Sequence, residues 1–389
     1  MNSSGAIYDV AVLGLGGMGS AAAWHCARRG VKVLGLEQFA PVHALGSSHG
    51  EWRVYREAYF EHPSYVPLAL RAGRLWEELE AAAQRPLFRR CGILMVTWPH
   101  SAVHQGCLAS ARQHGLPYRE LTATVLTDFF PTLRADAGQV GFFEPRAGAV
   151  RVEDSIHAHL ALAQAAGATL HFGEKVRRVT DEPHGAGVAL ETEKGIYRAR
   201  KLIFCAGAWS GAALAECGLE LRPRRVVQAW FAARPEALPP DRPAPVVFIE
   251  TKDGTLFYGL PPADPAAPDA AWKFAFHNRH EPCDPDAVRR VISPEEIAAL
   301  HEHIERYLPG LVGPVQRASV CLYELSPDEH FVLGPHPHRP AVTLAAGFSG
   351  HGFKFVPAIG EILADLSLAG RSAHDLSFFS PTRPRFAGK

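Results

Sequence analysis

The beginning of the chain constrains the fold most strongly, because a strand, a glycine-rich turn, a helix and a second strand follow one another there. Residues 7–13 (IYDVAVL) are predicted to form a buried strand. The helix that follows, SAAAWHCARRG, is predicted to end with Gly30 just past its last turn. The second apolar strand, VKVLGLE, ends in Glu37. Three glycines occupy the turn at GxGxxG spacing: Gly14, Gly16 and Gly19.

This βαβ pattern is typical of dinucleotide binding. The glycines permit a tight turn and a close backbone approach, and the amino end of the helix faces a pyrophosphate. An acid at the end of the second strand, here Glu37, meets ribose hydroxyls. An incidental Gly-rich turn is the alternative, but strand, helix and acid in register favour the nucleotide. NAD and FAD are held alike by such a unit, which leaves the choice between them open.

The rest of the chain predicts an α/β architecture in which the nucleotide-binding domain is discontinuous. A helix is expected from Glu153 (EDSIHAHLALAQAAG), followed by ATLHFGEKVRRV, a VALETEKGIYRA hairpin and an apolar strand, KLIFCAGAWS, that returns to the sheet beside the nucleotide. The Pro-rich stretches RPEALPPDRPAP and LPPADPAAPDA are expected to be loops of a second, β-rich α+β domain. We predict a Rossmann-type domain from residues 1–88, 148–221 and 326–389, and a substrate domain from residues 89–147 and 222–325.

Composition narrows the class of partner. With 389 residues the chain exceeds one ordinary core, so two domains are expected. Forty basic residues balance forty acidic ones, which gives no electrostatic reason to expect nucleic acid or an anionic membrane. No signal peptide is recognisable, and no run approaches the roughly 18 apolar residues of a membrane span. We therefore expect a cytoplasmic protein with a small-molecule partner.

The cysteines and histidines favour neither a disulfide framework nor a metal site. Seven cysteines are an odd number, widely scattered, with no CxxC pair. Histidine pairs such as His157 with His159 and His301 with His303 are two residues apart on expected helices, where side chains diverge. No metal is predicted.

The segment WKFAFHN, residues 272–278, alternates as a strand does and places Lys273 and His277 on one face. A surface strand with its polar face in water is one interpretation. The other is a sheet whose polar face covers an active site, with the preceding strand TLFYGL supplying Tyr258. A lysine near a flavin would place positive charge where the reduced cofactor meets dioxygen.

Two further stretches carry candidate ligand-binding groups. HGEWRVYREAY contains Arg53 and Arg56, whose spacing suits a carboxylate held by paired hydrogen bonds, although surface or ion-pair arginines are the alternative. AAGFSGHGFKF is an open, glycine-rich loop that can approach a planar ring through Gly350 and Gly352. It ends in Lys354, for which a solvated lysine after a plain turn is the alternative.

Cys321 lies in SVCLYELSPDEHF, where a strand would put it on one face with Tyr323. From its own surroundings in the sequence, a small buried packing residue is the more common role. A thiol that reacts is the other interpretation.

Taken together, these stretches resemble the monomeric sarcosine oxidase and N-methyltryptophan oxidase family of flavoproteins, over nearly the whole chain. The resemblance runs from GLGGMG through GSSHGEWRVYREAYFEHPSYVPLALRAGRLWEEL, FEPRAG and WKFAFH to CLYELSPDEHF and GFSGHGFKF, and the last two motifs are the most specific. It implies a two-domain FAD-binding fold of the type seen in glycine and D-amino-acid oxidases.

The resemblance also implies a role for each candidate residue. Cys321 is the expected thioether attachment point of FAD, with Tyr323 beside the ring. Arg56 and Lys354 would bind the substrate carboxylate, while Tyr258 and His277 would line the substrate cavity. Lys273 matches the family lysine that promotes the reaction of reduced flavin with oxygen. His49 and Arg53 would pack near the ring and balance charge on reduced flavin.

The implied reaction is oxidation of the C–N bond of a secondary, N-methyl amino acid such as sarcosine, with O2 reduced to H2O2, by a monomeric enzyme. Alternatives are an oxidase of a cyclic or sugar-modified amino acid (pipecolate, proline or a fructosyl amino acid), a flavin dehydrogenase with another electron acceptor, and a non-catalytic nucleotide-binding protein. The chain departs from the family's common GSHHGDTR at Ser48 and Trp52. These two departures leave the shape of the pocket and the packing beside the flavin open.

Overall fold

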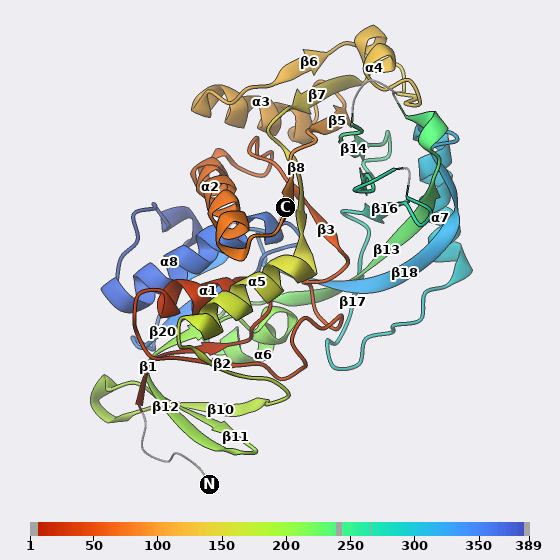
Figure 1. The fold of residues 1–389 in the computed structure, drawn as a ribbon. Coiled ribbons are helices and arrows are strands. Elements are labelled where there is room, and N and C mark those ends of the chain that lie inside the picture. Colours follow the sequence, from red (N-terminus) through yellow and green to blue (C-terminus); the bar gives the residue numbers. More distant parts are fainter. Residues whose placement is uncertain (1–6, 239–242, 266, 385–389) are drawn as a thin grey trace.

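A computed structural model describes residues 7–238, 243–265 and 267–384 of the chain (Figure 1). Three sheets of eight, nine and three strands organise these residues, and helices cover them. Parts of both Pro-rich stretches, at residues 239–242 and 266, lie outside the described residues. Their described parts contain turns and short non-strand segments, as predicted.

The eight-stranded sheet is built around the predicted βαβ unit. β1 lies between β2 and β12 and is parallel to both, which is the arrangement that the nucleotide-binding pattern predicts. The sheet follows the order β10-β11-β12-β1-β2-β9, with β20 paired to β12 and β19 to β20. Its strands are β1 (Ile7–Leu13), β2 (Val33–Leu36), β9 (Thr169–His171), β10 (Val176–Asp181), β11 (Val188–Thr192), β12 (Gly195–Phe204), β19 (Val332–Pro335) and β20 (Val342–Ala346).

Two details of this region differ from the sequence prediction. The first helix, α1 (Gly17–Ala27), begins three residues earlier than its predicted start at Ser20 and ends before Gly30, which follows as a left-handed turn residue with φ +79°. The predicted hairpin strand and the predicted returning strand are one continuous element, β12. Its first half is antiparallel to β11 and its second half is parallel to β1.

Helices α1 and α8 (Val356–Ala369) pack on this sheet, and α5 (Val152–Ala165) and α2 (Val66–Ala83) pack on those helices. Figure 1 shows α1 between α5 and α8, with α2 beyond them. Ala21 and Ala22 of α1 are fully buried, and Gly360 of α8 packs directly against them, so the two helices approach closely. The short helix α6 (Ser210–Leu214) follows β12.

The nine-stranded sheet contains the candidate residues Tyr258, Lys273 and Cys321. It follows the order β17-β13-β16-β15-β14-β5-β7-β6, and β18 pairs along β13. Its strands are β5 (Ile93–Thr97), β6 (Arg119–Leu121), β7 (Val140–Glu144), β13 (Arg222–Ala233), β14 (Val246–Glu250), β15 (Leu256–Leu260), β16 (Ala271–Phe276), β17 (Glu281–Pro282) and β18 (Val312–Leu325). Three helices, α3 (Ala102–His114), α4 (Ala123–Phe129) and α7 (Pro294–Tyr307), accompany it.

A small sheet links the two larger ones. It consists of β3 (Trp52–Tyr55), β4 (Phe88–Arg89) and β8 (Gly148–Arg151), with β8 in the middle. The fold is thus of the predicted class, α/β with a second, β-rich part. The domain boundaries at residues 88, 147, 221 and 325 stay a prediction.

Candidate active site

A cavity of about 1010 Å³ extends from the glycine-rich turn after β1 to the segments at the ends of β15, β16 and β18. Most of the predicted site residues line it, although they come from seven separate stretches of the chain. They are Gly14, Gly16, Glu37, Arg53, Arg56, Tyr258, His277, Tyr323, Gly350, Gly352 and Lys354. The other four, Gly19, His49, Lys273 and Cys321, are buried behind the lining.

The nucleotide end of the cavity has the geometry that the GxGxxG turn predicts. Gly14 has φ +87°, and a side chain there would collide with the backbone of Cys205 on the neighbouring strand end. Gly19 packs so closely against Gly14 that it also has no room for a Cβ atom. The carboxylate of Glu37 accepts the backbone N–H of Leu15 at 2.8 Å, which fixes the turn beside the helix. These features fit a bound dinucleotide.

Cys321 lies on β18 with only 3% of its surface exposed. Its sulfur is 3.3 Å from the Arg53 guanidinium and 3.4 Å from the carbonyl oxygen of Ser47, and both of these residues line the cavity. The Arg53 guanidinium thus donates directly to the sulfur from the side of the cavity. The environment therefore suits a cysteine that forms a bond at the edge of the cavity.

Lys273 is 1% exposed, which shows that the polar face of β16 does not lie in water. Its ammonium donates to the carbonyl oxygens of Gly50 and Trp52 at 2.8 and 2.9 Å. Burial lowers the pKa of Lys273 well below its usual value. The interpretation of this segment as a surface strand is wrong, since the lysine is held against the backbone that leads into β3.

His49 lies next to this lysine and is also buried. Its Nδ1 atom is 3.4 Å from the side-chain nitrogen of Gln228. Burial, together with the charges of Arg53 and Lys273, lowers the pKa of His49 to about 3. The imidazole is therefore neutral at neutral pH.

Aromatic side chains form the opposite wall of the cavity. Tyr258 on β15 lies opposite Ala275 on the neighbouring strand β16, and His277 follows directly after β16. Burial raises the pKa of Tyr258 and lowers that of His277 to about 4, so both side chains are uncharged at neutral pH. The ring of Tyr323 packs on Gly350, where φ is +80° and an added Cβ would be 2.5 Å from the ring. The glycine-rich loop thus brings its backbone into direct contact with the Tyr323 ring.

Arg56 is buried and its guanidinium already has a carboxylate partner. One terminal nitrogen contacts both oxygens of Glu61 at 2.6 and 2.7 Å, and the other donates to the carbonyl of Ala58. Burial raises the pKa of Glu61, but the charge of Arg56 outweighs it and brings the pKa to about 2. Of the two alternatives for Arg56, a surface position is wrong and an ion pair is present.

Lys354 lines the cavity and is 5% exposed. Its ammonium donates to the carbonyl oxygen of His351 at 2.7 Å and to the Tyr59 hydroxyl at 3.3 Å. An ammonium has three N–H donors, so one of them has no protein acceptor within the described residues. The alternative of a solvated lysine is wrong, because the side chain is buried, and this burial lowers the pKa of Lys354 well below its usual value.

Sequence reasoning missed the partners of these cations. Glu61, Tyr59 and His351 were not singled out, although an acid five residues after Arg56 was a visible signal. Tyr59 and His351 give no such signal, because 292 residues separate them in the chain and only folding brings them together.

The two departures from the family pattern have different positions. Trp52 does not line the cavity, and its ring stacks under the Arg151 guanidinium at 4.6 Å on the small sheet. Ser48 does line the cavity, and its hydroxyl accepts the backbone N–H of Gly17 in the first turn of α1 at 3.3 Å. The tryptophan thus affects packing away from the cavity, while the serine lies at its nucleotide end.

The described residues form neither a metal site nor a membrane-spanning helix. Within the residues that the structure describes, no set of three or more His, Cys, Asp and Glu side chains is arranged to hold a metal ion. No helix in the described ranges has both the length and the apolar character needed to cross a membrane. All seven cysteines are free thiols.

Comparison with known proteins agrees with this geometry. Residues 9–366 match the model of the family described as "DAO: FAD dependent oxidoreductase". The chain is 44% identical to the monomeric sarcosine oxidase of Streptomyces avermitilis, over 97% of both chains. It is 35% identical to the N-methyl-L-tryptophan oxidase of Salmonella enteritidis PT4, covering 97% of this chain and 99% of that one.

Solved structures show the same fold. NikD, an unusual amino acid oxidase essential for nikkomycin biosynthesis, superimposes with a TM-score of 0.84 at 30% identity, over 98% of this chain and 100% of that one. The glycine oxidase from Geobacillus kaustophilus gives a TM-score of 0.81 at 23% identity, over 97% of this chain and 99% of that one. The resemblance predicted from the motifs is therefore confirmed. The chain belongs to the DAO family of FAD-dependent oxidoreductases.

Proposed function

We propose that this enzyme is an oxidase of a secondary, N-methyl amino acid such as sarcosine, with O2 as the electron acceptor. Similarity to sarcosine and N-methyltryptophan oxidases supports the substrate class. The observation that carries the proposal is the unused N–H of Lys354 beside Arg56, in a cavity whose opposite wall is aromatic. A buried cation with a free donor suits the carboxylate of an amino acid.

The substrate carboxylate would bind Lys354 and Arg56. Lys354 offers its third donor, and Arg56 adds positive charge although Glu61 already accepts two of its hydrogen bonds. A bound carboxylate would compensate the buried charge of Lys354 and raise its depressed pKa. Tyr258 and His277, both uncharged, would then enclose the amine without adding a competing charge.

FAD, when bound, supplies the two-electron acceptor for oxidation of the C–N bond. The protein residues orient the substrate and exclude water. Hydrolysis of the resulting imine would complete the reaction, so that sarcosine, O2 and water give glycine, formaldehyde and H2O2. Lys273 and Arg53 would provide the positive charge that promotes the reaction of reduced cofactor with oxygen, and the neutral His49 would pack beside them.

We also propose that Cys321 holds FAD covalently through a thioether. The position of its sulfur supports this role, because it contacts Arg53 and Ser47, which both line the cavity. A cytoplasmic location, a monomeric state and the two-domain division remain predictions as well.

A panel of amino acids with peroxide detection tests the proposal. N-Methyl amino acids should give the highest kcat/KM, and one peroxide should form per amine oxidised. Higher kcat/KM for pipecolate, proline or a fructosyl amino acid would move the substrate class to those compounds. Turnover with an artificial quinone or dye but without peroxide would indicate a dehydrogenase instead.

A further inference from the structure

An ion pair near the end of the described chain lies close to the proposed substrate site. Arg383 binds Asp328 through two parallel hydrogen bonds, from Nε at 2.8 Å and from Nη2 at 2.7 Å. Both side chains are nearly buried, with 11% and 8% exposed. Such fork-shaped, poorly solvated pairs are geometrically specific. The C-terminal segment is thus attached to the loop that follows β18.

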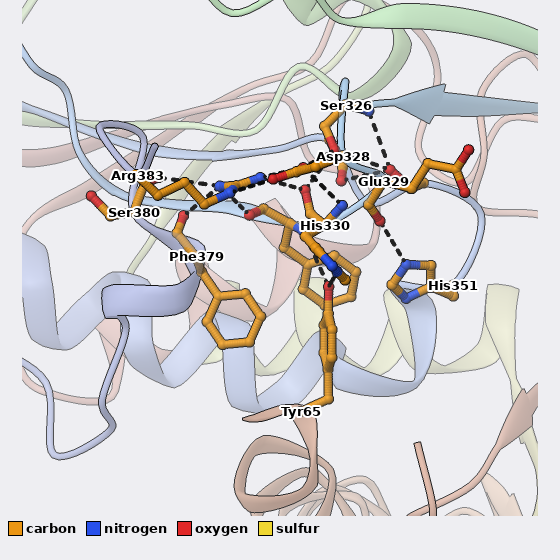
Figure 2. Close-up of polar contacts among 12 residues, drawn as sticks. Tyr65, Ser326, Asp328, Glu329, His330, His351, Phe379, Ser380 and Arg383 are labelled. Carbon is orange, nitrogen blue, oxygen red and sulfur yellow. Dashed lines mark hydrogen bonds and ion pairs between the residues drawn. The ribbon is translucent and has the colours of Figure 1, made fainter. Parts of the chain in front are cut away.

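The same guanidinium also holds the backbone on both sides. It donates to the carbonyl oxygens of His330 at 3.0 Å and Phe331 at 2.9 Å on the loop, and to those of Phe379 at 3.2 Å and Ser380 at 3.1 Å on its own segment (Figure 2). Loop and segment therefore form one polar cluster around a single arginine.

The loop at residues 326–330 is further tied by its own side chains. Asp328 accepts the Ser326 hydroxyl and the backbone N–H of His330, both at 3.1 Å. The Ser326 hydroxyl also contacts the His330 carbonyl at 2.7 Å. Glu329, at the tip, has φ +58°, a left-handed conformation that a non-glycine residue adopts only when its surroundings enforce it. Its carbonyl direction depends on these bonds.

That carbonyl begins a chain of hydrogen bonds that ends at Lys354. His351 Nε2 is 3.1 Å from the Glu329 oxygen, which can only accept, so Nε2 carries the imidazole proton. Nδ1 then accepts the Tyr59 hydroxyl at 2.6 Å, and the Tyr59 oxygen accepts Lys354 at 3.3 Å. The carbonyl of His351 is the second acceptor of Lys354. Figure 2 shows His351 directed at Glu329, beside the Asp328–Arg383 pair.

We propose that Arg383 is a positioning residue for Lys354. Arg383 fixes the 326–330 loop and with it the direction of the Glu329 carbonyl. That carbonyl orients the His351 ring through its hydrogen bond. His351 and Tyr59 then accept hydrogen bonds from the Lys354 ammonium and so orient it. Arg383 does not line the cavity. This inference rests on the proposed function, since it concerns how the carboxylate-binding lysine is aimed.

The test titrates FAD-loaded holoenzyme with acetate and follows the perturbation of the flavin absorbance. The variants are Arg383→Met, Asp328→Asn and Lys354→Met. The matched control is Arg225→Met, which removes another buried arginine that binds carboxylates, those of Glu281 and Glu296, and two backbone carbonyls. Melting temperature and FAD content are measured for each variant, and KM and kcat are measured with the best amine.

Arg383→Met should raise the acetate Kd and the KM on the order of fivefold, with FAD content unchanged and kcat within about twofold. Asp328→Asn, which keeps the size of the side chain, should act in the same direction, and Arg225→Met should leave both constants unchanged. Arg383→Lys should fall between wild type and Arg383→Met, because lysine keeps the charge but cannot form the fork.

Three results would overturn the inference, and failure of the positioning role is distinguishable from failure of the carboxylate site. If Lys354→Met weakens acetate binding but Arg383→Met and Asp328→Asn do not, or if Arg225→Met weakens it equally, then Arg383 does not position the lysine. If Lys354→Met itself has no effect, the proposed carboxylate site is wrong, and the positioning role fails with it.

Discussion

Replacing Lys354 by methionine tests the proposed carboxylate site most closely. Methionine has nearly the same length but no charge and no donor. A charge-assisted hydrogen bond contributes about 1.5–3 kcal/mol. At about 1.4 kcal/mol per factor of ten, Lys354→Met should raise the Kd of acetate roughly 10- to 150-fold.

The effect on folding should be much smaller. The variant removes the lysine donor from the His351 carbonyl and the Tyr59 oxygen, which costs about 1–3 kcal/mol, although the Tyr59 hydroxyl still contacts that carbonyl at 3.1 Å. It also removes a buried ammonium whose depressed pKa shows that burial disfavours its charged form. These opposing effects leave the melting temperature within a few degrees of wild type, so a weaker Kd would report binding.

Titration across pH gives a second, independent signature. Acetate favours the charged form of Lys354, and the pKa of this lysine lies well below 10.5. In wild type, acetate binding should therefore weaken as pH rises through that lowered pKa, and this part of the pH dependence should vanish in Lys354→Met. A Kd within twofold of wild type, or an unchanged pH profile, would refute the reasoning.

Three further predictions concern other buried groups. Acid precipitation of wild type should leave the yellow colour in the pellet, whereas Cys321→Ala should release it; colour in the wild-type supernatant would disprove the thioether. In stopped-flow experiments, Lys273→Met should slow flavin reoxidation at least tenfold and flavin reduction less than twofold, and equal effects would defeat the assignment. Burial lowers the pKa of His159 to about 3. Below pH 6.5 the unfolded chain therefore binds a proton that the folded chain does not bind. The free energy of unfolding falls as pH falls from 6.5 towards 3. His159→Leu should therefore lose about 2 kcal/mol less than wild type between pH 7 and pH 5, measured by urea unfolding at both pH values, and an identical loss would count against it.

The sequence predicted local patterns better than long-range partners. The βαβ unit was readable because its strand, turn and helix are consecutive, and the alternation of WKFAFHN put Lys273 and His277 on one face whatever lay opposite. Whether that face met water or a cavity depended on where β3 lies, about 220 residues away, and periodicity contains no such information.

The same limit applies to the cations. Arg56 and Lys354 were identified, but Glu61, Tyr59 and His351 define what these cations can still bind, and two of the three gave no sequence signal. Arg383 is the clearest case, because an arginine near the end of the chain has no pattern that links it to Asp328. Resemblance to a family supplied roles for Arg56 and Lys354 but not for their partners or for Arg383.

Anaerobic mixing with amino acids tests the central claim most directly, because it separates oxidation of the amine from every later step. The account predicts that sarcosine or another N-methyl amino acid bleaches the flavin absorbance fully, while glycine, which differs from sarcosine only by the N-methyl group, bleaches it far more slowly. Failure of every secondary amino acid to bleach the flavin, or faster bleaching by glycine, would contradict it.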